Sequence, residues 1–200
     1  MSTQDTPRSW WQFLLIFGLL VTAILFDEGG NMMTGFGLKS EVQQVSAQPE
    51  DLTGTDLELL KEVMPGTDSF SEKEGQPPVF KAYRTDPASG EQKLIGYVFQ
   101  TADTPPEEVG YSAPIEVLVG MDLEGSITGI KVLYYIESIR WIWGDFLSAP
   151  GYQEQFSGKH ISDAFQVDSD IDGISRATIT VRAMSIGIRN SARRVAEAYL

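Results

Sequence analysis

Four segments with the composition of β-strands follow one another in two pairs, and this pattern limits the possible folds. The segments are residues 79–84, 94–100, 115–121 and 126–135. Asp, Pro, Ser and Gly at residues 86–90 favour a turn within the first pair, and residues 122–125 do so within the second. Strands joined by short turns pair in an antiparallel way. The sequence therefore predicts two β-hairpins in the middle of the chain.

Helical patterns flank the two hairpins. Residues 51–64 place leucines near helical spacing, and a Pro-Gly pair ends this segment. Residues 181–200 predict a longer amphipathic helix with an apolar face. That face holds Ala183, Met184, Ile188, Ala192, Val195 and Tyr199. Three arginines in its C-terminal half, Arg189, Arg193 and Arg194, suit the negative end of the helix dipole. Hairpins with a few segregated helices indicate the α+β class.

The composition excludes several classes of function. The 200 residues carry a net charge of −13, whereas nucleic acids and anionic lipid headgroups attract Lys- and Arg-rich surfaces. The sequence has no cysteine and a single histidine, His160, which excludes thiolate and multi-histidine zinc sites and cysteine-bound iron–sulfur clusters. It also holds no motif of a catalytic triad or a nucleotide phosphate loop. We expect no nucleic acid, no metal and no catalytic residue, and we expect His160 to be a surface or hydrogen-bonded residue.

An uncharged apolar run near the N-terminus predicts a membrane anchor. Residues 10–26 include two polar side chains, and a spanning helix needs about 17 to 25 predominantly apolar residues. Trp10 and Trp11 stand where an interfacial aromatic belt lies, and Arg8 favours a cytoplasmic N-terminus. A cleaved signal peptide is the alternative, but the acidic residues that follow Phe26 make a poor cleavage site.

These signals divide the chain into four expected parts. They are a cytoplasmic tail of residues 1–9, a single transmembrane helix of residues 10–28, a connection of residues 29–50 and one extracytoplasmic α+β domain of residues 51–200. The apolar run of residues 10–26 would be the part that meets the membrane.

Residues 172–178 read Asp-Gly-Ile-Ser-Arg-Ala-Thr, and they resemble the site at which bacterial flavin transferases attach FMN to a threonine through its phosphate. The family pattern is Asp-Gly-x-Ser/Thr-Gly-Ala-Thr, and its final threonine carries the flavin. Four further blocks follow the family order and widen the resemblance to roughly residues 60–195. They are residues 63–70, 94–99, 110–115 and 119–130. The chain is similar to the FMN-binding domain of the Rnf complex G subunit, of the C subunit of the sodium-pumping NADH:quinone reductase, and of the periplasmic part of NosR.

The resemblance implies that FMN is bound covalently, through a phosphoester to the Thr178 hydroxyl. We expect Asp172 and Gly173 to shape the turn, and Ser175 and Thr180 to offer hydroxyl groups to the phosphate. Backbone N–H groups at the start of the following helix also favour an anion there. The other residues expected at the flavin are Ala177, Arg176, Tyr111, Ser112 and Glu137.

The resemblance also implies a location and partners. Proteins of this family are membrane redox subunits, so it implies a bacterial inner membrane with the domain facing the periplasm. It implies a flavin transferase for maturation and other membrane redox subunits as partners in electron transport.

One position and one segment depart from the family pattern. Arg176 stands where the family has glycine; its guanidinium suits a phosphate, and in the opposite interpretation it obstructs the transferase. The family also carries Glu-Thr-Pro-Gly-Leu-Gly after the second hairpin. Residues 137–144 keep Glu137 but replace the Pro-Gly turn with a segment that contains Trp141 and Trp143. The departures indicate a divergent branch of the family.

The sequence leaves the roles of several residues open. Glu137 either faces the flavin or is a solvated strand end, and Tyr111 either lines the flavin pocket or packs in the core. Trp141 and Trp143 either flank the flavin, dock on a membrane partner or pack internally.

Three functions agree with these features. We favour a membrane-anchored subunit that carries covalent FMN and transfers electrons within an oxidoreductase complex, because a protein without substrate machinery supplies placement while the cofactor supplies the chemistry. A flavin-free structural or assembly subunit is the main alternative. A flavin-dependent reductase of a small molecule is the third, and it would need a proton donor near the flavin ring.

Overall fold

A computed structural model describes residues 57–138 and 140–200, apart from the side chains of Trp141 and Trp143. The helix α2 (Leu57–Val63) comes first. Five strands follow, namely β1 (Ser69–Phe70), β2 (Phe80–Thr85), β3 (Gln92–Gln100), β4 (Glu116–Asp122) and β5 (Ile127–Tyr134). The other helices are η1 (Thr101–Asp103), α3 (Arg140–Trp143), η2 (Phe146–Ser148), η3 (Glu154–Phe156) and α4 (Thr178–Tyr199), where η denotes a 3-10 helix.

The N-terminal parts that the sequence predicts lie outside these residues. They are the tail of residues 1–9, the anchor of residues 10–28 and the connection of residues 29–50. From Leu57 onward, none of the described helices combines the length and the apolar character that crossing a bilayer requires.

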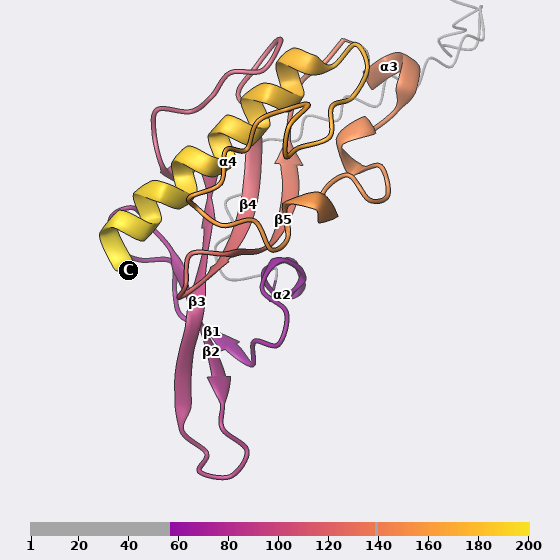
Figure 1. Cartoon of the computed structure of the whole chain (residues 1–200). Coiled ribbons are helices and arrows are strands. Elements are labelled where there is room, and N and C mark those ends of the chain that lie inside the picture. Colours follow the sequence, from indigo (N-terminus) through magenta and orange to yellow (C-terminus); the bar gives the residue numbers. More distant parts are fainter. Residues whose placement is uncertain (1–56, 139) are drawn as a thin grey trace, which may run out of the picture. The chain divides into compact units, whose positions relative to one another are not determined.

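The strands form one antiparallel sheet in the order β1-β2-β3-β4-β5, so that each strand lies beside its neighbour in the sequence. This confirms both predicted hairpins, and the observed strand ends agree with the expected ones within two residues. A third pairing, between β3 and β4, joins the two hairpins; it places Phe99 opposite Val119. The sheet and the helices together confirm the α+β class (Figure 1).

Helices α2 and α4 cover opposite faces of this sheet. Successive side chains of a strand point to opposite faces. In β4, Val117 and Val119 belong to one buried cluster and Leu118 belongs to another. The first cluster includes the α4 residues Val181, Met184, Ile188, Ala192 and Val195. The second includes the α2 residues Leu60 and Val63. The domain therefore has three layers, with the sheet in the middle.

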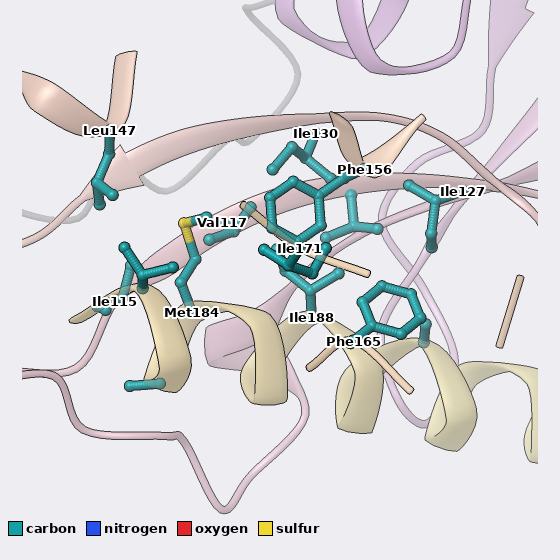
Figure 2. Packing of buried hydrophobic residues seen from close by; sticks show 14 of the residues in the cluster. Ile115, Val117, Ile127, Ile130, Leu147, Phe156, Phe165, Ile171, Met184 and Ile188 are labelled. Atoms are coloured by element: carbon teal, nitrogen blue, oxygen red, sulfur yellow. The ribbon is translucent and has the colours of Figure 1, made fainter. Parts of the chain in front are cut away.

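The segment between β5 and α4 contributes to the core although it contains little regular structure. Figure 2 shows Phe156, Phe165 and Ile171 of this segment packed in one group with Ile127 of the sheet and Ile188 of α4. The rings of Phe156 and Phe165 lie 6.4 Å apart between centroids. Because these side chains are buried, the loop that leads to residues 172–178 is attached to the core along its length.

The same segment covers the outer edge of β5. The Val132 N–H donates to Gln153 Oε1 at 3.2 Å, and Ser157 Oγ donates to the Thr128 carbonyl oxygen at 3.0 Å. An exposed strand edge invites pairing with other chains. These side chains satisfy the edge groups and protect β5 from such pairing.

Helix α4 confirms one expectation and corrects two. Its predicted apolar face is buried, except that Tyr199 is half-buried. However, the helix begins at Thr178 rather than at Val181. The explanation of its arginines by the helix dipole was wrong, because the last turn carries no basic residue. Arg193 instead donates to the Ile161 carbonyl oxygen at 2.7 Å, and Arg194 donates to that of Thr104 at 2.6 Å.

Two facing glycines allow α2 to approach the sheet. Gly120 of β4 pairs with Gly129 of β5, and the end of α2 lies against both. A Cβ atom on Gly120 would collide with the Val63 carbonyl oxygen, to which Thr128 Oγ1 donates a hydrogen bond of 2.5 Å. Only a residue without a side chain fits at this contact.

We therefore predict that Gly120→Ala destabilises the domain. Because the new methyl group would meet backbone atoms, we expect the free energy of unfolding to fall by about 1–3 kcal/mol. Gly187→Ala is the matched control, since its Cβ would lie 3.6 Å from Glu108 in ordinary contact and alanine favours a helix by about 1 kcal/mol. Urea unfolding followed by circular dichroism measures both effects. An unchanged urea midpoint for Gly120→Ala would contradict the packing described above.

Candidate functional site

The motif of residues 172–178 ends where α4 begins. The Ala177 N–H donates to the Ile174 carbonyl oxygen at 3.0 Å and closes a turn. Ala177 is buried and occupies the position before the helix, where its side chain makes no capping hydrogen bond. Thr178 is the first helical residue, and it is exposed. The Thr178 hydroxyl is therefore accessible at the positive end of a helix of 22 residues.

Arg176 adopts the backbone conformation that explains the family's glycine. Its φ angle is +67°, in the left-handed region. A side chain with a Cβ atom costs about 1–2 kcal/mol there, whereas glycine adopts this region readily. The loop of this chain thus follows the course that a glycine would favour, with an exposed arginine in its place.

Asp172 and Gly173 attach the motif to the preceding loop. The Asp172 N–H donates to Gln155 Oε1 at 2.7 Å. A Cβ atom on Gly173 would lie 3.1 Å from Asp168 Oδ1, which is a tight approach. The positive φ belongs to Arg176 and not to Gly173. Asp172 and Gly173 therefore fix the position of the loop, and Arg176 makes its sharp turn.

Glu137 joins three segments that are distant in the sequence. It follows β5 and is buried, with 6% of its surface exposed. Its Oε1 accepts a hydrogen bond from the Tyr111 N–H at 3.1 Å and another from the hydroxyl of Thr180 in the first turn of α4. The interpretation of Glu137 as a solvated strand end was wrong. The expectation that Thr180 offers its hydroxyl group to the phosphate was also wrong, because Thr180 is 1% exposed and donates this hydroxyl to Glu137.

Exposed apolar residues stand next to the members of this network in the sequence. Tyr111 is 63% exposed, so its interpretation as a core residue was wrong. Ile136 adjoins Glu137 and is 48% exposed, and Ile179 adjoins Thr178 and is 59% exposed. We call Tyr111, Ile136 and Ile179 the apolar collar. Because hydrogen bonds hold the Tyr111 backbone and the first turn of α4 to Glu137, these exposed residues belong to segments that meet at one point, and they are candidates for a binding surface. Ser112 and Ser175 are exposed and contribute hydroxyl groups beside the collar and in the motif, respectively.

A second hydrogen-bonded group supports the backbone next to Glu137. Tyr135 donates its hydroxyl to Asp145 Oδ1 at 2.6 Å, and the Arg140 guanidinium lies 4.6 Å from the centre of the Tyr135 ring. Burial and the hydrogen bond to the Asp145 carboxylate raise the pKa of Tyr135, so this side chain stays neutral. The expected alternatives for Trp141 and Trp143 concern side chains outside the described part of the structure and stay open.

Two further side chains bear on the expected site. Arg182 is exposed one helical turn after Thr178, on the same side of α4. Arg182 was not among the residues expected from the sequence, although its spacing of four residues from Thr178 is a signal for it. The expectation for His160 is confirmed, because its ring nitrogens lie 2.7 Å from Ser162 Oγ and 2.9 Å from the Glu124 carbonyl oxygen. Within residues 57–138 and 140–200, no three acidic or histidine side chains come together as metal ligands.

The conformation of Arg176 gives a prediction that is independent of any ligand. We expect Arg176→Gly to be more stable than Arg176→Ala by about 1 kcal/mol, because only alanine carries the cost of a Cβ atom at positive φ. Both variants lack the arginine side chain, so its own interactions cancel. At Ser175, whose φ is not positive, glycine should give no such advantage over alanine. Urea unfolding of Arg176→Gly, Arg176→Ala, Ser175→Gly and Ser175→Ala measures these differences in stability. Equal stability of the two Arg176 variants would contradict the prediction.

The candidate site lies within a segment that matches a known protein family. Residues 110–193 match the family model described as an FMN-binding domain, and this range contains Tyr111, Glu137, Thr178 and Thr180. The sequence is 29% identical over 108 residues to the G subunit of the Na⁺-translocating ferredoxin:NAD⁺ oxidoreductase complex of Acetobacterium woodii. The aligned part is 50% of this chain and 48% of the relative, so the chain spans about half the length of the curated relative that it matches. The family match over residues 110–193 and this relative together support the resemblance of the chain to the FMN-binding domain family.

Proposed function

We propose that this chain is an electron-transfer flavoprotein subunit of a membrane redox complex and that it carries FMN on Thr178. The observation that carries the proposal is the exposed Thr178 hydroxyl at the N-terminus of α4, inside the segment that matches the FMN-binding model. When bound, FMN accepts and donates electrons, and the protein holds it in place. The name of the Acetobacterium relative, which places it in an oxidoreductase complex, supports other redox subunits as partners.

The first turn of α4 fits a phosphate group. Its N–H groups have no intrahelical partners, and together with the helix dipole they favour an anion. Arg182 lies on the same side of the helix as Thr178, and Arg176 is two residues before it. These groups would hold the phosphoester, with Ser175 as a further hydroxyl donor. Ser112 and the apolar collar would adjoin the rest of the flavin.

The attachment needs an activated donor and an enzyme. The Thr178 oxygen forms the bond to the flavin phosphorus, and its proton is lost. The bond that breaks is the phosphoanhydride of an FMN derivative, whose second phosphate leaves with the rest of the donor. We propose that a flavin transferase catalyses this step, because Thr178 has no hydrogen-bonded base within the described part of the chain that would activate its hydroxyl group.

The environment of Glu137 favours an electron carrier over a reductase. A reductase of a small molecule needs a group that gives a proton at the flavin. Glu137 is the buried carboxyl group of the site, and its Oε1 serves as the acceptor of two hydrogen bonds. It therefore acts as a structural acceptor.

We further propose that residues 10–28 anchor the chain in a bacterial inner membrane and that the domain faces the periplasm. The apolar run of residues 10–26, the tryptophans at its start and Arg8 before it support this arrangement. The anchor would keep the flavin near the partner subunits, and the covalent bond would prevent its loss in a compartment without a supply of free FMN.

Mass spectrometry of the full-length chain tests the covalent flavin. After co-expression with a flavin transferase, we expect a mass increase equal to FMN less one water, and fluorescence of the denatured band in a gel. Thr178→Ala should lose both signals, whereas Ser175→Ala keeps the attachment threonine and should retain them. A wild-type chain without the adduct would overturn the proposed covalent flavin and favour a flavin-free structural subunit.

The side chain of Arg176 should assist flavin attachment. We expect Arg176→Ala to carry about two- to fivefold less flavin than Arg176→Lys at equal reaction time, the effect of about 0.5–1 kcal/mol for an exposed charge. Alanine and lysine carry the same Cβ atom, so the comparison isolates the charge. Intact-mass measurements give the flavin content. If Arg176→Ala or Arg176→Gly accepted more flavin than the wild type, the arginine would obstruct the transferase instead.

A further inference from the structure

The motif places two threonines in a single helical turn, and the structure treats them differently. Thr178 is exposed, whereas Thr180 is 1% exposed and donates its hydroxyl to Glu137. Residues two positions apart in an α-helix point about 200° away from each other. If the side chain of Thr180 is fixed toward the interior, that of Thr178 must point toward solvent.

Glu137 fixes more than the helical turn. The oxygen that accepts from Thr180 also accepts from the Tyr111 N–H, so the loop with the exposed Tyr111 ring is held at the same point. Tyr111 lies 26 residues before Glu137, and Thr180 lies 43 residues after it. Both donors therefore belong to segments that are distant from Glu137 in the sequence. The carboxylate is thus a tertiary link between the loop and the start of α4.

We propose that Glu137 is a positioning residue that selects Thr178 as the site of flavin attachment. It holds the Thr180 hydroxyl inside the domain, which presents Thr178 to the transferase and withholds Thr180 from it. This inference rests on the proposed function, since the reaction in question forms the Thr178 phosphoester with loss of the hydroxyl proton and of the donor's second phosphate. Glu137 acts through Thr180 and Tyr111 and takes no part in the bond that forms.

Four variants separate this role from a general loss of stability. Glu137→Ala removes the acceptor, and Glu137→Gln keeps an amide oxygen at the same place without the charge. Thr180→Val keeps the shape of Thr180 and removes the hydroxyl donor. Ser185→Ala is the control, because Ser185 is a buried hydroxyl residue of the same helix that donates to the Val181 carbonyl oxygen and not to Glu137.

Hydrogen exchange tests the link without any flavin. In Thr178→Ala chains, we expect faster amide exchange at Tyr111 when Glu137→Ala is added. At the first turn of α4, we expect faster exchange with either Glu137→Ala or Thr180→Val. The changes should be about tenfold, the effect of losing one buried hydrogen bond. Glu137→Gln should restore most of the protection, and Ser185→Ala should leave these two places unchanged. Equal protection in Glu137→Ala and in the parent chain would overturn the positioning role.

Flavin attachment to the full-length chain then tests the selection. Co-expression with a transferase and peptide mapping by mass spectrometry give both the amount and the position of the flavin. We expect Glu137→Ala and Thr180→Val to carry about tenfold less flavin on Thr178, and Glu137→Gln to recover most of it. Flavin on Thr180 in Glu137→Ala would support the selection directly. Normal loading of Thr178 in both Glu137→Ala and Thr180→Val would overturn it, as would an equal loss in Glu137→Gln and Glu137→Ala.

The two proposals fail in different ways. A wild-type chain that takes no flavin overturns the proposed function and the selection, while the exchange experiment still decides whether Glu137 holds the two segments. A wild-type chain that is loaded on Thr178, with Glu137→Ala and Thr180→Val loaded equally, leaves the proposed function intact and overturns the selection alone. If Glu137→Ala does not fold, Thr180→Val provides the same decision.

Discussion

The shape of the candidate site depends on one buried carboxylate oxygen. Burial of a charged or polar group is costly unless hydrogen bonds satisfy it. Glu137 meets this requirement with donors from a loop before β4 and from the first turn of α4. Because these donors are far apart in the sequence, the loop, the strand end and the helix start take their positions together. The exposed residues beside them, Thr178 and Tyr111, take their positions from the same contacts.

The rest of the fold brings these three segments to one place. Helix α4 packs with its apolar face against the sheet. Buried aromatic rings hold the loop before α4, so the start of the helix has a fixed position. On the other face, α2 approaches closely at Gly120 and Gly129. Arginines of α4 bind carbonyl oxygens of neighbouring loops. These hydrogen bonds attach the loops to α4, and the position of the site depends on this helix and on the sheet.

The sequence predicted the sheet well because the signals for strands and turns are local. It placed the start of α4 three residues late, since Ala177 has no capping side chain that would mark the N-terminus of the helix. It named Glu137 and Thr180 as site residues but could not place their side chains, because burial and hydrogen bonding depend on contacts across 43 residues. The left-handed backbone conformation of Arg176 could not be predicted either, since the residue type of an arginine does not indicate a positive φ angle. The resemblance of the chain to a known family, by contrast, rested on short motifs that are visible in the sequence.

The sequential order of the strands affects how the domain reaches its finished form during synthesis. Since β1 to β5 pair with their neighbours in sequence, the sheet can assemble from the N-terminal side as the chain leaves the ribosome. Helix α4 comes last, and Thr180 can meet Glu137 only after this helix has docked. The outward presentation of Thr178 is therefore a late event in folding. A maturation enzyme that requires this geometry would modify completed domains and pass over unfinished ones.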